Sequence, residues 1–307
     1  MTPDPPDRDA RYRRTGTIHV LNLGAGVQST TLYLMFCKGE LVGEYPPLDF
    51  AIFADTQDEP RAVYDHLEWL RSLGGPPILT GTAGRLGDDL SRGVNSTGQR
   101  FASIPAYTTA VEGRPDGMTR RQCTAEYKID VVERVIRRDV LGLAKGGRVP
   151  KSVRVVQSLG LSYDEPRRVA RTRLRFAAHP WSSPSFPLFD LFVTRAECRR
   201  WLAGQSIPHE VPRSACCFCP YRSNAEWRDL RDNDPAGWSR AVAVDDAMRA
   251  ADRIRNRRLD QSLYVHRSCV PLAAADIDTP EPDSIQGAFQ FSRLGVVESE
   301  CEGMCGV

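Results

Sequence analysis

The feature that most constrains the fold of this chain is a short apolar strand that runs into a glycine turn and then a helix. Thr17–Leu23 (TIHVLNL) is rich in β-branched and apolar residues, and Gly24-Ala25-Gly26 follow at once. Thr30–Lys38 then has apolar side chains at helical spacing. Small residues in such a turn let backbone amides approach a phosphate, and the helix dipole favours negative charge there.

The alternation of strands and helices continues along the chain. Asp49–Ala54 and Pro77–Thr80 predict strands, and Pro60–Leu73 predicts the helix between them. Further strands are expected at Val153–Leu159 and, more weakly, Leu174–Ala178, and further helices at Tyr127–Leu141, Thr194–Ala203, Asn224–Asp232 and Asp234–Ala251. We therefore expect an α/β fold whose doubly wound parallel sheet is covered on both faces.

Composition and pattern divide the 307 residues into four regions. Residues 1–16 are rich in Pro, Asp and Arg and are expected to be a disordered tail. Residues 17–213 carry the α/β pattern, with a long loop expected at Gly81–Met118. A helical region with several cysteines follows at 214–275, and an acidic C-terminal tail at 276–307 contains a Cys-x-x-x-Cys pattern.

The overall composition excludes several classes of protein. Hydrophobic residues make up 41% and charged residues 26%, as in a globular protein. No apolar run approaches the ~18 residues of a spanning helix, and the N-terminus has no apolar signal-peptide core. We expect a cytoplasmic protein without a membrane partner. The net charge of only +2 excludes a polycation that coats nucleic acid.

Cysteine is the residue type that points most directly to chemistry. There are nine cysteines and no export signal, so structural disulfides are not expected. Cys216 and Cys219 have the C-x-x-C spacing that lets two thiolates bind one metal ion or cluster. Zinc and iron–sulfur sites both use this spacing.

Five motifs, taken in order, resemble the PP-loop (adenine-nucleotide alpha-hydrolase-like) superfamily, and within it the phosphoadenylyl-sulfate reductase family. They are the turn Gly24–Thr30, Asp55-Thr56 after the second strand, Arg120–Lys128 around Cys123, Gly160–Arg168, and Cys216–Arg222. The resemblance covers Thr17–Arg222. The family's first turn reads Ser-Gly-Gly-Lys-Asp-Ser, and here Val27 and Gln28 stand in place of Lys and Asp.

The resemblance implies a PP-loop fold that binds ATP with Mg²⁺, and it assigns residues to each site. The nucleotide-binding residues it implies are Gly24, Ala25, Gly26, Gln28, Ser29, Thr30, Asp55, Gly160, Glu165 and Arg168. Cys123 would join Cys216 and Cys219 as a ligand of a four-iron cluster, with zinc as the alternative. Arg121 and Lys128 would be catalytic, together with Cys301 and Cys305 of a tail like the cysteine-bearing tail of the reductases.

Three functions fit these residues. The first is an ATP-dependent sulfurtransferase, which adenylates an acceptor with loss of pyrophosphate and then replaces AMP by sulfur. The second is a reductase of phosphoadenylyl sulfate or adenylyl sulfate, and the third is a non-catalytic nucleotide- or metal-binding protein. The expected partners are an adenine nucleotide, a sulfur donor and an acceptor, which could be a nucleic acid, a nucleoside or a small metabolite. A homodimer is left open.

Overall fold

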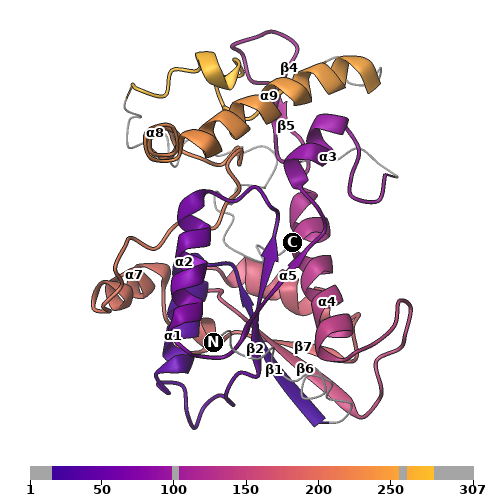
Figure 1. The fold of residues 1–307 in the computed structure, drawn as a ribbon, viewed down its shortest axis with the longest axis vertical. Helices are drawn as coiled ribbons and strands as arrows, with labels where there is room; N and C mark the ends of the chain where they lie inside the picture. Colours follow the sequence, from indigo (N-terminus) through magenta and orange to yellow (C-terminus); the bar gives the residue numbers. More distant parts are fainter. Residues whose placement is uncertain (1–15, 99–103, 256–260, 280–307) are drawn as a thin grey trace, which may run out of the picture.

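The computed structural model describes residues 16–98, 104–255 and 261–279, with only the backbone of 251–255 (Figure 1). Its centre is a five-stranded sheet with the order β3-β2-β1-β6-β7, in which every neighbouring pair is parallel. The strands are β1 (Gly16–Leu23), β2 (Phe50–Asp55), β3 (Ile78–Thr82), β6 (Val153–Leu159) and β7 (Ser182–Ser185). The expected α/β fold with a parallel sheet is confirmed.

Helices cover both faces of this sheet because alternate residues of β1 point to opposite sides. Ile18 and Val20 pack into a core with one set of helices, and Leu21 and Leu23 pack into a core with another (Figure 1). The first set is α4 (Asp130–Val135) and α5 (Pro166–Phe176), and the second is α1 (Val27–Cys37), α2 (Arg61–Ser72) and α7 (Arg195–Ala203). The chain leaves β1 toward one face and the adjacent β6 toward the other, so a topological switch point lies between these two strands.

A third hydrophobic core forms a lobe beside the sheet, at the top of Figure 1. Trp227 is fully buried in this core, as expected for a helical tryptophan. The lobe contains α3 (Leu86–Arg92), α8 (Asn224–Asn233), α9 (Pro235–Arg255) and the antiparallel sheet β5-β4-β8, with β4 at Tyr107–Thr109, β5 at Gly117–Met118 and β8 at Ser262–Tyr264. The remaining short elements are η2 (Ala125–Ile129), η3 (Ile136–Val140), α6 (Pro187–Asp190) and η4 (Leu272–Ala274).

One sequence-based expectation is wrong. The strand expected at Leu174–Ala178 is instead the end of α5 and the turn after it, and the edge strand β7 follows. The segment Gly81–Met118, expected to consist mainly of loop, also contains the short elements α3, β4 and β5. These elements have seven, three and two residues, too few to show a periodicity in the sequence.

The start of the expected C-terminal tail packs against α8. Ile277 is buried, Arg231 forms an ion pair with Asp278 at 2.9 Å, and Asn224 Nδ2 donates to the Asp276 carbonyl at 3.1 Å. Residues 280–307 and 1–15 lie outside the described part of the chain. Within the described ranges, no helix has the length and apolar character needed to cross a bilayer.

Candidate functional site

The turn between β1 and α1 is closed by a side chain of the helix that follows it. The amides of Gly24 and Gly26 donate to the Ser29 hydroxyl at 3.2 and 3.3 Å, and Ala25 has a left-handed backbone with φ of 57°. The turn therefore places the N-terminus of the 11-residue helix α1 at the end of the central strand. This is the position at which α/β proteins bind phosphate groups.

Gly160, at the end of β6, packs directly against this turn. A Cβ atom at Gly160 would lie 2.9 Å from the Ser29 nitrogen and 3.1 Å from the Gln28 carbonyl carbon. Both are backbone atoms, so any larger residue would push the start of α1 away from β6. Because Gly160 has no side chain, the end of β6 and the start of α1 can pack closely against each other.

A buried polar cluster connects the start of α1 to α5. Glu165 accepts hydrogen bonds from the Ser162 amide at 3.1 Å and from Gln28 Nε2, and it pairs with Arg168. Arg168 is only 6% exposed, and its Nη2 has no hydrogen-bond partner; the same is true of buried Gln28 Oε1. Buried polar atoms without partners are costly, so this cluster is suited to receive a polar group of a ligand.

Two residues assigned to the nucleotide site have their side-chain contacts elsewhere. Asp55 lies at the end of β2, where its Oδ1 accepts from the Gln57 amide at 2.7 Å and the Tyr64 hydroxyl at 2.9 Å. Thr30 Oγ1 lies 2.9 Å from His66 Nε2, on the side of α2. The structure brings the remaining eight together at the switch point: Gly24, Ala25, Gly26, Gln28, Ser29, Gly160, Glu165 and Arg168.

Residues from distant parts of the sequence line one pocket between the sheet and the second lobe. The pocket has about 360 Å³ of empty space, including the part that opens to solvent. Five residues singled out in the sequence share it: Arg121, Cys123, Lys128, Cys216 and Cys219. Thr56, Leu86, Ile104, Pro105, Pro220 and Tyr221 complete its lining.

The three thiols of this cysteine pocket influence one another. A hydrogen bond with Cys219 raises the pKa of the Cys216 thiol well above its usual value, and burial and the nearby Glu59 and Cys123 act in the same direction. Three clustered thiols are the soft donor set that zinc or an iron–sulfur cluster requires once they are deprotonated. Among the described residues, however, no three His, Cys, Asp or Glu side chains are already arranged to hold a metal ion.

Lys128 connects the two halves of the site. It lines both the cysteine pocket and a smaller pocket beside Gly24. Lys128 is carried by the π-helical turn η2, a distortion that is frequent at functional sites. Its side chain is 8% exposed, and its Nζ lies 3.7 Å from Oε1 of Glu59, which is 1% exposed. The Glu59 carboxylate is therefore a buried partner of the Lys128 ammonium group.

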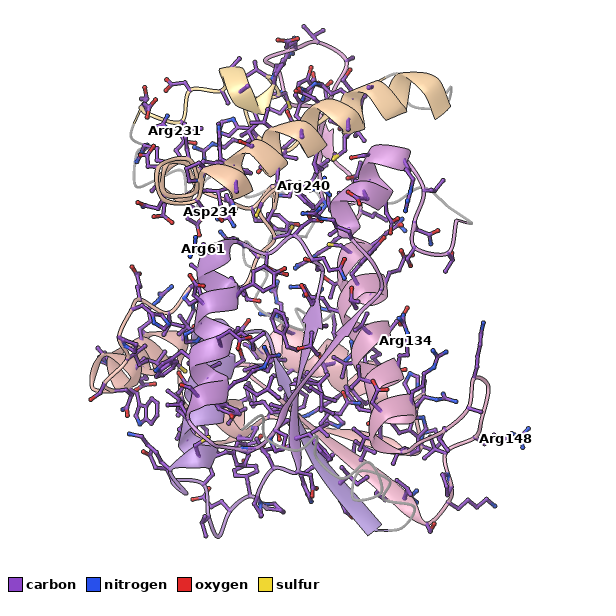
Figure 2. The ribbon with its side chains drawn as sticks, in the orientation of Figure 1. Arg61, Arg134, Arg148, Arg231, Asp234 and Arg240 are labelled. Carbon is purple, nitrogen blue, oxygen red and sulfur yellow. The ribbon has the colours of Figure 1, made fainter. Side chains whose placement is uncertain are left out.

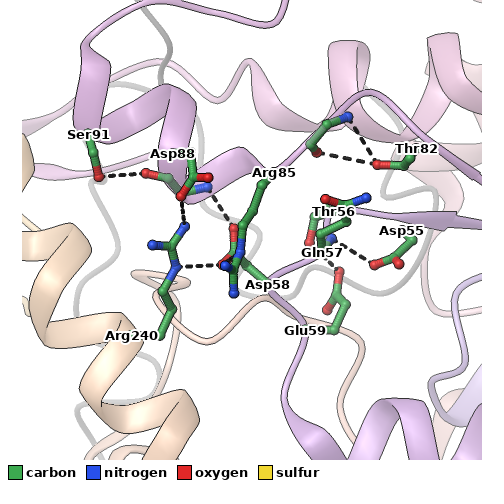
Figure 3. Close-up of polar contacts among 12 residues, drawn as sticks. Asp55, Thr56, Gln57, Asp58, Glu59, Thr82, Arg85, Asp88, Ser91 and Arg240 are labelled. Atoms are coloured by element: carbon green, nitrogen blue, oxygen red, sulfur yellow. Dashed lines mark hydrogen bonds and ion pairs between the residues drawn. The ribbon is translucent and has the colours of Figure 1, made fainter.

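Buried charges that the sequence does not reveal hold the cysteine pocket in place. The Asp58 carboxylate is fully buried and accepts from Arg85 Nε at 3.1 Å, Arg240 Nε at 2.7 Å and the Gly87 amide at 2.7 Å (Figure 3). The Asp58 carbonyl accepts from the Cys217 amide at 2.8 Å. One residue thus ties the loop after β2 to α3, to α9 and to the cysteine loop.

Two further contacts support the same loop and its lobe. Arg222 Nη2 donates to the carbonyls of Ala215 and Cys216 at 3.1 and 3.2 Å, so the arginine of the Cys216–Arg222 motif shapes the C-x-x-C loop. Asp234 accepts from the Arg61 amide at 2.9 Å, and Figure 2 shows these two residues where the lobe meets α2. The Arg222 contacts lie within or next to the Cys216–Arg222 motif, whereas the contact of Arg61 with Asp234 joins residues 173 apart and has no local signal in the sequence.

Comparisons with protein-family models, with curated proteins and with solved structures gave no significant match. The two predicted catalytic cysteines of the tail, Cys301 and Cys305, lie outside the described residues. The candidate site therefore consists of the switch-point turn, the cysteine pocket and Lys128 between them.

Proposed function

We propose that the protein is an ATP-dependent sulfurtransferase of the PP-loop type, which adenylates an acceptor and then thiolates it. The observation that carries the proposal is the position of Lys128, which lines both the pocket beside Gly24 and the pocket of the three cysteines. A nucleotide at the turn and a sulfur-bearing group at the cysteines would be neighbours across this one side chain. Adenylation and sulfur transfer require that proximity.

The nucleotide half would use the N-terminus of α1 and Arg168. Phosphate oxygens would replace the Ser29 hydroxyl as acceptors for the Gly24 and Gly26 amides. The unpartnered nitrogen of Arg168 offers a charge-assisted hydrogen bond, which offsets the absence of a lysine in the turn. Mg²⁺ would need a carboxylate, and Asp55, at the end of β2, would have to supply its second oxygen, because Oδ1 accepts from the Gln57 amide and the Tyr64 hydroxyl.

In the first step, a carbonyl oxygen of the acceptor bonds to the α-phosphorus, and the bond to pyrophosphate breaks. Lys128 and Arg168 would neutralise the negative charge that develops on the phosphates. In the second step, sulfur attacks the activated carbon and AMP leaves with the original oxygen. An iron–sulfur cluster held by Cys123, Cys216 and Cys219 would supply an iron site able to carry sulfide, and zinc would be held by the same three thiolates.

Two measurements test the proposal. Anaerobic purification with iron and zinc analysis should give metal that is lost in Cys216→Ser and in Cys123→Ser alike; full metal content in Cys123→Ser would remove this residue from the site. ATP should release pyrophosphate in the presence of the acceptor. Sulfite release from adenylyl sulfate or phosphoadenylyl sulfate would instead identify a reductase.

Gly160→Ala tests the nucleotide half separately. Its Cβ would displace backbone atoms of Ser29 and Gln28, so the affinity for Mg²⁺-ATP in isothermal titration should fall roughly tenfold or more. Gly204→Ala is the matched control, because its Cβ would meet nothing closer than 3.4 Å. Equal affinities of the two variants would contradict a nucleotide at this turn.

A further inference from the structure

We propose that single-stranded nucleic acid binds to the outer surface of α5 and the turn after α6, and that it presents the acceptor base to the neighbouring site. The binding itself is independent of the proposed function, whereas the role of the bound strand as acceptor rests on it. This α5–α6 surface is defined by Tyr163, Arg167, Arg171, Arg173, Phe189 and Phe192.

Three aromatic rings form the apolar part of the surface. The ring of Tyr163 lies 5.5 Å from that of Phe189 and 5.1 Å from that of Phe192, between ring centroids. Tyr163 is 44% exposed and Phe192 68% exposed, so these two rings face solvent, while Phe189 is partly buried against the core of the sheet. Exposed rings of this kind are platforms on which nucleobases stack.

The backbone of Phe192 adds a second observation. Its φ is 60°, a left-handed conformation that is unfavourable for a bulky residue and that glycine or asparagine would adopt more easily. Burial of the ring does not compensate for this strain, since most of the ring is exposed. The left-handed residue ends α6, where the Val193 amide donates to the Leu188 carbonyl at 2.8 Å. Glycine would serve this turn with less strain, so a bulky exposed ring at this position points to a function for the side chain.

Arginines supply the charge beside these rings. The α5 sequence PRRVARTRLRF contains five arginines and no acidic residue. Arg167 and Arg171 are exposed and one helical turn apart, and the 58% exposed side chain of Arg173 stacks on Phe186 at 5.4 Å. Guanidinium groups suit the phosphates of a nucleic acid backbone.

In the described part of the chain, the acidic groups near this surface reduce its charge but are fewer than its arginines. Asp190 lies 3.9 Å from Arg173, and Asp164 accepts from the Arg195 amide at 3.2 Å. Glu165 pairs with buried Arg168 and faces the switch point. Among the described residues, Arg167, Arg171 and Arg173 thus outnumber Asp164 and Asp190, which gives this surface a positive formal charge.

The surface adjoins the candidate nucleotide site through one loop. Tyr163 directly follows Ser162, whose hydroxyl accepts from Gln28 Nε2 at 2.6 Å, and the Tyr163 amide donates to the Val193 carbonyl at 2.8 Å. From the same helix, Arg168 points inward to Glu165 while Arg167 is exposed. A strand that stacks on Tyr163 and Phe192 would thus have its neighbouring base within reach of the switch point.

Rings together with arginines favour a single strand over a duplex. A duplex keeps its bases stacked inside and can offer only phosphates and groove edges, whereas a single strand offers base faces to rings and phosphates to guanidinium groups. Ribose and deoxyribose strands share this chemistry, so the experiment must compare them.

The test is fluorescence anisotropy with the full-length protein, without ATP, and labelled 15-residue oligonucleotides: single-stranded RNA, single-stranded DNA and a duplex of the same sequence. At least one single strand should bind several-fold more tightly than the duplex. Phe192→Asn removes the ring but keeps a residue that tolerates the left-handed backbone, and it should weaken single-strand binding roughly fivefold or more. Equal affinity for duplex and single strand would overturn the proposal.

A double variant, Arg167→Ala with Arg171→Ala, removes charge at exposed helix positions. The slope of the logarithm of its binding constant against the logarithm of the salt concentration should become shallower by about 1.4, because each phosphate contact with a single strand contributes about 0.7 to that slope. Arg148→Ala is the control, because this exposed arginine precedes β6 and so lies at the other end of the strand from Tyr163 (Figure 2). Unchanged binding in both surface variants, or an equal effect of Arg148→Ala, would overturn the proposal.

Two further readouts separate the alternatives. A second copy of the chain on this surface would appear in sedimentation as a dimer that Phe192→Asn dissociates, and that result would also overturn the proposal. Pyrophosphate release is measured separately. Oligonucleotide binding without ATP cleavage would refute the proposed sulfurtransferase and support this binding surface. ATP cleavage without oligonucleotide binding would support the sulfurtransferase and refute this binding surface.

Discussion

The turn after β1 and the cysteine pocket are held in place by different kinds of interaction. In the turn, two backbone amides contact Ser29 within five residues of sequence, and the pairing of β1 with β6 lies directly behind it. In the pocket, a buried carboxylate joins segments that are 182 residues apart, Asp58 and Arg240. A feature built from backbone tolerates the loss of one side chain, whereas one built from a few buried charges does not.

The substitution with the largest expected effect breaks the pocket and spares the turn. Asp58→Ala would leave Arg85, Arg240 and the Gly87 amide without their shared acceptor. Because both arginines are partly exposed and can be rehydrated, we expect a loss at the low end for a buried ion pair, about 3 kcal/mol of unfolding free energy in urea. Iodoacetamide labelling of Cys216 and Cys219 should accelerate, and Mg²⁺-ATP affinity should stay within about twofold.

Asp88→Ala is the matched control for this prediction. Asp88 also pairs with Arg240, at 2.5 Å, but its side chain is 49% exposed. Its loss should cost less than about 1 kcal/mol. If the two aspartate variants destabilised the protein equally, the buried carboxylate would not be what holds the lobe.

A second prediction acts on the side of the turn and depends on pH. His66 is buried, with Trp69 stacked at 5.4 Å, Thr30 at 2.9 Å and His209 at 2.8 Å. Burial, followed by the neighbouring His209, lowers the pKa of His66 from 6.5 to about 4. The folded protein therefore resists protonation that the unfolded chain accepts, so stability present above pH 6.5 is lost as the pH falls toward 4.

The expected size is about 2 kcal/mol between pH 7.5 and pH 5, attributable to this one group. Urea unfolding of the wild type and of His66→Gln at both pH values isolates it, because every other titrating group is common to the two proteins. The wild type should lose about 2 kcal/mol more than His66→Gln over this interval. Equal losses would mean that His66 is not protected from protonation in the fold.

The same contrast explains what could be predicted from the sequence. The turn at Gly24 and the parallel sheet follow from local patterns, since a strand, small residues and a helix leave a signal within about twenty residues. The convergence of Cys123 with Cys216 and Cys219 has no local signal and was expected only through the family resemblance. The pairing of Asp58 with Arg240 could not be predicted, because charged residues are common and tertiary packing decides which of them meet.

The wrongly predicted strand has a physical reason of the same kind. Arg173 to Phe176 alternates charged and apolar residues, as the exposed edge of a sheet does. In the fold, however, Val169, Thr172 and Phe176 form the buried face at helical spacing, and Leu174 is 76% exposed. Four residues are too few to distinguish the period of a strand from that of a helix, because Phe176 fits both patterns.

The smallest expected effects come from a matched pair of helix caps, one on each region. Ser223 caps α8, directly after the cysteine loop, and its hydroxyl accepts from the Glu226 amide at 3.2 Å; Thr194 caps α7, on the sheet, and accepts from the Glu197 amide at 3.3 Å. Ser223→Ala and Thr194→Ala should each cost about 1 kcal/mol of unfolding free energy, since each leaves one amide of the first turn without its acceptor.

The two cap variants should nevertheless differ in thiol reactivity. Loss of the Ser223 cap frays the helix that anchors Cys216–Arg222, so labelling of Cys216 and Cys219, followed peptide by peptide with mass spectrometry, should accelerate several-fold. Loss of the Thr194 cap frays a helix on the far side of the sheet core, so those two rates should not change, while the exposed Cys37 provides an internal reference in both variants. Equal acceleration in the two variants would show that the pocket opens only by global unfolding, and that its stability is shared with the turn rather than set by its own buried charges.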